Sequence, residues 1–281
     1  MSGTRGMTGA GRDGGRDRGR IMGAAVPRRL LMVLVGLAAG LLSGLFGVGG
    51  GVLLVPALVG VLGLDHRRAA ATSLVAILPT SVVGALTYGL RGQVSVVAAV
   101  VLLAGTLVGA QVGAWLLHRL PARVLPWTFA TFVILVLVSQ QVVPPVRHAD
   151  LVLDPVRVVA LVVVGLAAGV LSGLVGVGGG VVVVPGLEAA VGLGDLLARG
   201  TSLAVMVPTA VSGAVAHLRR GHADLATGAV TGLASSVASP VGALLAARVP
   251  PGATSWMFSV FLVVVAVLVL RRSSGGSSAS R

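Results

Sequence analysis

Two glycine-rich motifs are the part of the sequence whose residue types point most directly to chemistry. Each is a Gly-Val-Gly-Gly-Gly pentapeptide inside a hydrophobic run, and each precedes an apolar stretch that ends in a proline, Pro56 or Pro185. Four glycines in five residues lack the side chains that hold a helix, and they leave the backbone free for positive φ and for close approach by another group. The candidate substrate-binding glycines are Gly47, Gly49, Gly50 and Gly51 in the first motif and Gly176, Gly178, Gly179 and Gly180 in the second.

The motifs do not have the pattern of a nucleotide-binding loop. A Walker A loop ends in Gly-Lys-Ser/Thr, and the chain contains no lysine; a dinucleotide fingerprint needs glycine at the position of Val52. Within a membrane, non-helical backbone is tolerated where it is buried in protein or lines a watery cavity. A helix that restarts after such glycines presents unpaired N–H groups that suit an anion. The alternative is that the glycines only let helices approach closely.

Two Thr-Ser pairs and one glutamate are the other polar groups that could meet a substrate. The hydroxyls of Thr72, Ser73, Thr201 and Ser202 can cap a helix, bond across helices or contact a substrate oxygen. Glu188 lies in a short apolar segment, where an ionisable side chain is a candidate for proton coupling; the other interpretation places it at the membrane interface. The apolar segments contain no Ser-His-Asp set, carboxylate pair or metal-ligating cluster, so we expect no enzyme activity, no metal and no cofactor.

The composition predicts the elements that must position these groups. Of 281 residues, 56% are hydrophobic and 10% are charged, whereas a soluble domain carries about 25% charged residues. Several runs approach the ~18 apolar residues of a membrane-spanning helix. They lack the period-2 alternation of an outer-membrane barrel. We therefore predict an all-α polytopic membrane protein embedded in a lipid bilayer.

The chain contains an internal duplication. The two glycine motifs begin at positions 47 and 176, and 176 − 47 = 129. At that offset, residues 36–56 match residues 165–185 at 17 of 21 positions, and proline, Thr-Ser, arginine and tryptophan positions stay in register beyond them. The sequence predicts two homologous repeats of four to five helical segments each, 8–10 in all, with a short glycine-interrupted segment in each half. Such paired short segments are typical of a transporter binding site.

The predicted organisation follows from this duplication. We expect a disordered basic tail at 1–29, a first transmembrane repeat at 30–143, a linker at 144–155, a second repeat at 156–271 and a flexible tail at 272–281. The apolar segments are approximately 30–46, 52–64, 69–90, 94–118 and 125–143, then 157–175, 181–194, 198–218, 224–247 and 254–270.

The orientation in the membrane is predicted only in part. Five crossings per unit would make the halves inverted and four would make them parallel, and the loop arginines favour neither. Both arrangements leave the two termini in the cytoplasm, as expected from the seven arginines that precede the first hydrophobic run. That basic tail has no aromatic residues to stack on bases, so we expect no nucleic-acid partner.

The glycine motif also resembles the signature of a known family. Gly-Leu-x-Gly-Val-Gly-Gly-Gly-x-x-x-Val-Pro occurs from Gly44 to Pro56 and again from Gly173 to Pro185. It is similar to the signature of the TauE/SafE membrane permeases, in which the motif also occurs in both halves and is followed by a Thr-Ser pair. The resemblance covers about residues 30–270. It implies a multi-pass inner-membrane carrier for small anions, such as sulfite or small organosulfonates like sulfoacetate.

The leading functional hypothesis is a secondary transporter of small anions that works by alternating access between the two repeats. The alternative is a non-transporting integral membrane subunit of a larger complex. Paired interrupted segments in a duplicated chain favour the transporter. The substrate, the direction of transport and the coupling ion are left open by the sequence.

Overall fold

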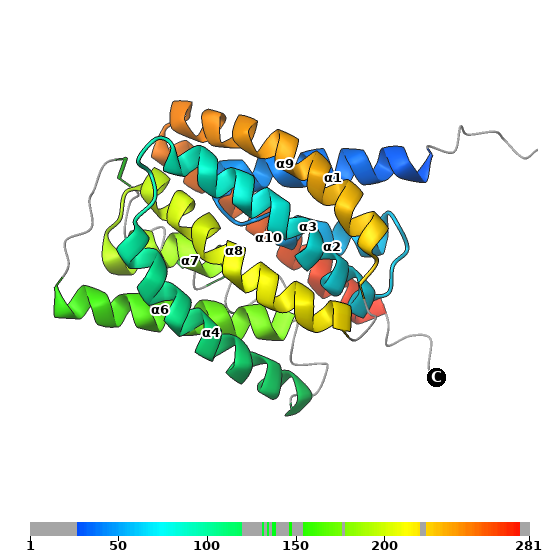
Figure 1. Ribbon diagram of the computed structural model, residues 1–281, viewed down its shortest axis with the longest axis horizontal. Coiled ribbons are helices and arrows are strands. Elements are labelled where there is room, and N and C mark those ends of the chain that lie inside the picture. Colours follow the sequence, from blue (N-terminus) through cyan, green and yellow to red (C-terminus); the bar gives the residue numbers. More distant parts are fainter. Residues whose placement is uncertain are drawn as a thin grey trace, which may run out of the picture.

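The fold is a bundle of helices, and the residues that it describes contain no strand (Figure 1). The computed structural model describes residues 27–119, 131, 134, 137–138, 146–147, 154–175, 178–219 and 223–275. The predicted segment 125–143, between α4 and α6, falls almost entirely outside these residues. The helices are α1 (Arg28–Phe46), α2 (Gly51–Gly60), α3 (His66–Gly89), α4 (Val96–Arg119), α6 (Pro155–Val175), α7 (Gly180–Gly186), the π-helix η1 (Leu187–Val191), α8 (Asp195–Arg219), α9 (Leu225–Arg248) and α10 (Pro251–Gly275).

Five of the described helices are long and apolar enough to cross a membrane. These spans are Arg28–Phe46, Arg68–Gly89, Val96–Gly113, Pro155–Leu174 and Leu225–Arg248. The predicted segments coincide with the observed helices to within a few residues at most ends, because long Val-, Leu- and Ala-rich runs leave helix as the structure that satisfies the backbone in lipid. The prediction of an all-α polytopic membrane protein is confirmed.

Small residues bring α1 against α9 at close range. A Cβ added to Gly36 would lie 2.5 Å from the carbonyl oxygen of Thr231, and Gly44 faces the carbonyl oxygen of Ser239 in the same way. Lipid tails are as apolar as leucine, so close van der Waals packing through small residues is a main source of helix association in membranes. Because the contacts advance together along both helices, α1 and α9 run parallel.

The same packing recurs between α4 and α6. A Cβ added to Gly165 would lie 2.7 Å from the Leu102 carbonyl oxygen, and one on Gly105 would lie 2.8 Å from that of Val162. At the offset of 129, Gly165 corresponds to Gly36, and Leu102 corresponds to the Thr231 that Gly36 faces. Each half of the chain therefore contributes a helix to a pair completed by the other half.

The two pairs are joined by α3 and α8, which run antiparallel. Leu74 of α3 packs on Gly213 of α8, and Leu203 of α8 packs on Gly84 of α3. Figure 1 shows α1 and α9 along one edge, α4 and α6 along the other, and α3 and α8 between them. We name the two groups related by the offset of 129 the α1–α3–α9 bundle and the α4–α6–α8 bundle; α8 packs on α4 and, more extensively, on α3.

Helix directions within these bundles require the chain to turn back after each glycine motif. α1 and α3 both run parallel to α9, so the chain between Phe46 and His66 must return to the side from which α1 started. The ten residues of α2 cover only about 15 Å of that return. The segment of α7 and η1 makes the corresponding return before α8. Among the described helices, these directions are those of inverted halves; the number of passes, the homology of the halves and the domain boundaries stay predictions.

Thiol labelling tests the inverted directions. Val61 precedes α3, and Ala190, its counterpart at the offset of 129, precedes α8; both are exposed. Because α3 and α8 are antiparallel and the chain has no cysteine, Val61→Cys and Ala190→Cys should react with a membrane-impermeant maleimide from opposite sides. With cytoplasmic termini, Ala190→Cys reacts in intact cells and Val61→Cys only after permeabilisation. Reaction of both from one side would contradict the inverted arrangement.

Candidate functional site

Both glycine motifs are breaks between helices in which the backbone takes positive φ. In the first break φ is 72° at Gly47, 71° at Gly49 and 74° at Gly50. In the second break φ is 85° at Gly178 and 73° at Gly179. A residue with a Cβ pays a steric cost in this region, which explains why glycine occupies these positions. Gly51 and Gly180 are the first residues of α2 and α7, and Gly176 lies outside the described residues.

The structure brings the two breaks together. A Cβ added to Gly180 would lie 2.9 Å from the Cα of Val48 in the other break. Met206 of α8 lies against Gly49 and Gly178, and Ile77 of α3 lies beside it. Ile77 and Met206 correspond at the offset of 129, so equivalent side chains of α3 and α8 fill the space between the breaks.

Three side chains cap the end of α1 at the first break. The Tyr88 hydroxyl donates to the carbonyl of Gly44 (2.7 Å), an Arg199 Nη to that of Leu45 (2.6 Å), and the Ser202 hydroxyl to that of Gly47 (2.8 Å). The last carbonyls of a helix have no partner within it, and the membrane interior offers no water to replace one. Donors on α3 and α8 therefore hold the break in place.

The two threonines of the Thr-Ser pairs bond across helices. The Thr72 hydroxyl accepts from the backbone N–H of Asp224 (3.0 Å), and the Thr201 hydroxyl accepts from that of Ser95 (3.0 Å). Each bond fixes the start of a helix contributed by the other half, α9 or α4. Hydrogen bonds from Thr227 hold the pKa of the Asp224 carboxyl below its usual range at the start of α9.

The two serines of these pairs bond to backbone carbonyls. Ser202 donates to Gly47 at the first break, whereas Ser73 donates to Ala70 in its own helix (2.8 Å). All four hydroxyl-bearing residues are fully buried. Interhelical bonding, one of the three alternatives from the sequence, is thus observed for three of them, and contact with a substrate stays a prediction.

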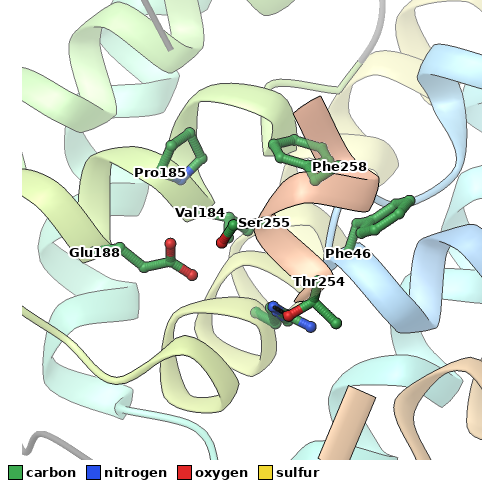
Figure 2. A pocket seen from close by; sticks show the side chains of 8 residues that line it. Phe46, Val184, Pro185, Glu188, Thr254, Ser255 and Phe258 are labelled. Carbon is green, nitrogen blue, oxygen red and sulfur yellow. Dashed lines mark hydrogen bonds between the residues drawn. The ribbon is translucent and has the colours of Figure 1, made fainter. Parts of the chain in front are cut away.

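A small pocket, with room for about one water molecule, lies beside the first break. It is bounded by the end of α1, α7 with η1, α8 and α10. Figure 2 shows the Glu188 carboxylate pointing toward the turn of α10 that carries Thr254 and Ser255. The sequence left the place of Glu188 open between the membrane interior and its interface; the structure places it on η1 in the wall of this pocket. The lining residues are Phe46, Val184, Pro185, Glu188, Arg199, Thr254, Ser255 and Phe258.

Arg199 brings a buried positive charge to the same pocket. The residue is 3% exposed; besides its bond to Leu45 it donates to the Thr254 hydroxyl (2.9 Å) and pairs with Asp195 (3.5 Å). Its Nε has no hydrogen-bond partner among the described residues. Sequence reasoning did not single out Arg199, although the Asp195–Arg199 spacing of four residues in an apolar stretch was an available signal.

An ion-pair network continues from Arg199 to the linker between the halves. Arg147 contacts the Asp195 oxygen that also faces Arg199, at 3.2 Å, and donates to the carbonyls of Ala246 (2.9 Å) and Val249. The Asp195 N–H in turn donates to the carbonyl of Val146 (2.9 Å). The linker is thereby fastened to the start of α8 and the end of α9.

A polytopic helical protein in which two short helices start at chain breaks that meet between its halves has the architecture of a membrane transporter. Residues 8–139 and 161–281 match the family model described as Sulfite exporter TauE/SafE, so the chain belongs to this family. The resemblance seen in the doubled glycine motif is confirmed.

Three relatives of this chain have names that describe them as probable membrane transporters. The chain is 28% identical to a "Probable membrane transporter protein" of Haemophilus influenzae over 262 residues, which cover 85% of this chain and 96% of the relative. It is 27% identical to the Bacillus subtilis "Probable membrane transporter protein YdhB" over 69% of this chain and 81% of the relative. It is 30% identical to YunE of the same organism over 41% of this chain and 45% of the relative. These names indicate a membrane transporter rather than an enzyme.

Removal of one cap tests how strongly the break depends on it. Tyr88→Phe leaves the Gly44 carbonyl without its donor and should cost about 1 to 3 kcal/mol of stability, measured as a lower thermal midpoint of the purified protein. Thr80→Val is the matched control, because the buried Thr80 hydroxyl donates only within its own helix, to Ala76 (2.9 Å). An equal decrease of the thermal midpoint in both variants would show that the hydrogen bond to Gly44 stabilises the protein no more than one within a single helix.

Proposed function

We propose that this protein is a secondary transporter of small anions, with sulfite or small organosulfonates such as sulfoacetate as substrates. The observation that carries the proposal is the meeting of two chain breaks next to a buried arginine, in a chain of the TauE/SafE family. The family description names sulfite export, which supports an oxyanion as substrate. The protein is proposed to lie in the inner membrane with both termini in the cytoplasm.

The electrostatics near the breaks favour an anion. Arg199 stands directly beside the first break, since a Cβ added to Gly47 would lie 2.7 Å from the Cα of Arg199. The N-caps of α2 and α7, Gly50 and Gly179, have no side-chain cap, so their first N–H groups are available to another acceptor. A guanidinium group matches the geometry of a planar or tetrahedral oxyanion. Of the site residues predicted from the sequence, Glu188 is the one that lines the pocket beside the first break; the glycines of the breaks and the Thr-Ser pairs lie outside its wall and are proposed to meet the substrate when the breaks separate.

Alternating access is proposed to occur between the two bundles. The sequence predicted motion between the two repeats; we propose motion between the bundles instead, because α9 of the second half packs against α1 of the first through close glycine contacts. Motion of the α1–α3–α9 bundle against the α4–α6–α8 bundle leaves those contacts intact. It changes the α3–α8 contact and the meeting of the breaks, where a substrate would be exposed to one side and then the other.

Anion flux into liposomes tests the proposal. Purified protein should carry labelled sulfite, sulfoacetate or sulfate across the membrane, and Gly178→Val should lower the flux about tenfold or more. The added side chain would meet Met206, since a Cβ at Gly178 lies 2.7 Å from the methionine Cε, and φ there is 85°.

Gly252→Val is the matched control, because no heavy atom lies within 4 Å of a Cβ at Gly252. Wild-type protein that carries no anion at all would refute the transporter and favour a non-transporting membrane subunit. Full flux in a folded Gly178→Val variant would show that the second break serves packing alone.

A further inference from the structure

Glu188 and Arg199 have no charged counterpart at the equivalent positions of the first half. At the offset of 129, Glu188 corresponds to Val59 and Arg199 to Ala70. Both apolar counterparts lie on α2 and α3, near the opposite side of the membrane from Glu188 and Arg199. Arg199 and Tyr88 cap α1 at the first break, and both are replaced by other residues at the equivalent positions of the other half. Glu188 has no such hydrogen bond among the described residues, so helix capping explains Arg199 but not the Glu188 carboxylate.

The network around Arg199 has a net positive charge without Glu188. Arg147 and Arg199 contribute two positive charges, and Asp195, which lies between them, contributes one negative charge. An ionised Glu188 makes the sum zero, whereas a protonated Glu188 leaves one positive charge uncompensated in a buried place. Such a charge is costly unless a counter-ion joins it.

Arg199 caps α1 and still has one N–H group without a hydrogen-bond partner among the described residues. Its two Nη groups are used by Leu45, Thr254 and Asp195, while Nε has no partner. No hydrogen bond or ion pair of the Glu188 carboxylate is found among the described residues, although both side chains line the same pocket. An oxygen acceptor placed in this pocket would meet both side chains.

We infer that the substrate anion and the Glu188 carboxylate are alternative counter-ions of Arg199, so that the anion binds when Glu188 takes up a proton. The inference rests on the proposed anion transport and adds its coupling: one proton is bound for each anion. Protonation of Glu188 removes the negative charge that repels the substrate anion. The positive charge of Arg199 can then attract that anion. The pocket has room for about one water molecule in the structure, so the anion enters when the two bundles separate, and both ions leave on the other side.

Among the residues that the structure describes, few other groups carry charge around Glu188. The charges of Arg199 and Asp195 on α8 interact electrostatically with the Glu188 carboxyl group. The residues of α1 and α10 that line the pocket are uncharged. α6, which packs on η1, has one charged residue, Arg157, and that side chain pairs with Asp154 at the start of the helix (3.7 Å). Arg147 reaches the pocket only through Asp195. Asp195 lies between two arginines, whereas the Glu188 carboxylate has no ion-pair partner among the described residues; Glu188 is therefore the better candidate to take up a proton.

The pH dependence of anion binding to the purified full-length protein tests this inference. Sulfoacetate and sulfate serve as probes, because their charge is constant between about pH 6 and pH 8. Wild-type affinity, measured by calorimetry, should fall by up to about tenfold for each pH unit as Glu188 ionises. Glu188→Gln is neutral at every pH. At both about pH 6 and about pH 8 it should bind the anion with the affinity that the wild type has at the lower pH.

Two further variants complete the test. Asp154→Asn removes a carboxylate outside the pocket and should keep the wild-type pH dependence. Arg199→Gln should lose at least about tenfold in affinity at both pH values. Wild-type pH dependence in Glu188→Gln, or wild-type affinity in a folded Arg199→Gln, would overturn the inference. Flux in liposomes separates the two proposals: anion flux with pH-independent binding would overturn only the coupling, whereas absence of flux would overturn the transporter itself.

Discussion

The structure depends on the need to satisfy backbone groups where α1 stops beneath the protein surface. Carbonyls at the end of a helix lose their internal partners, and lipid offers none in exchange. Tyr88 of α3 and Arg199 and Ser202 of α8 supply the donors. These bonds fix α3 and α8 against the break, and the other helices pack around that pair. The glycine motif is therefore stable only because both bundles contribute to it.

The same arrangement is compatible with the proposal that Arg199, a helix cap, also meets a ligand. Arg199 caps a helix through one end of its guanidinium and lines a pocket with Glu188 through its remaining surface. An arginine, unlike a lysine, has five donors in a fixed plane, so it can hold a carbonyl and still face an anion. In the proposed transport cycle the breaks separate, and the hydrogen bonds from α8 to the end of α1 would then have to be exchanged.

Much of the fold could be predicted from the sequence, since long apolar runs determine helices in a membrane and the glycine motifs determine where they break. The partners of the helices could not be predicted. The ladders at Gly36 and Gly165 are nearly identical, so nothing local decides that one packs on α9 and the other on α4. The helix directions could not be predicted either. The loop arginines are nearly equally divided between the two sides of the membrane, so the directions follow only from the helix contacts. Arg199 was missed because its burial follows from tertiary packing rather than from its neighbours in the sequence.

The most direct test of this account measures which helices move together. Spin-labelled cysteines at exposed positions can be added to the cysteine-free chain as two pairs, Leu34 with Leu233 and Leu34 with Val108. The first pair joins different halves within the α1–α3–α9 bundle, and the second joins the two bundles within one half. With excess sulfite or sulfoacetate, the Leu34–Val108 distance should shift while the Leu34–Leu233 distance stays constant. A shift between Leu34 and Leu233, with Leu34–Val108 unchanged, would contradict the account.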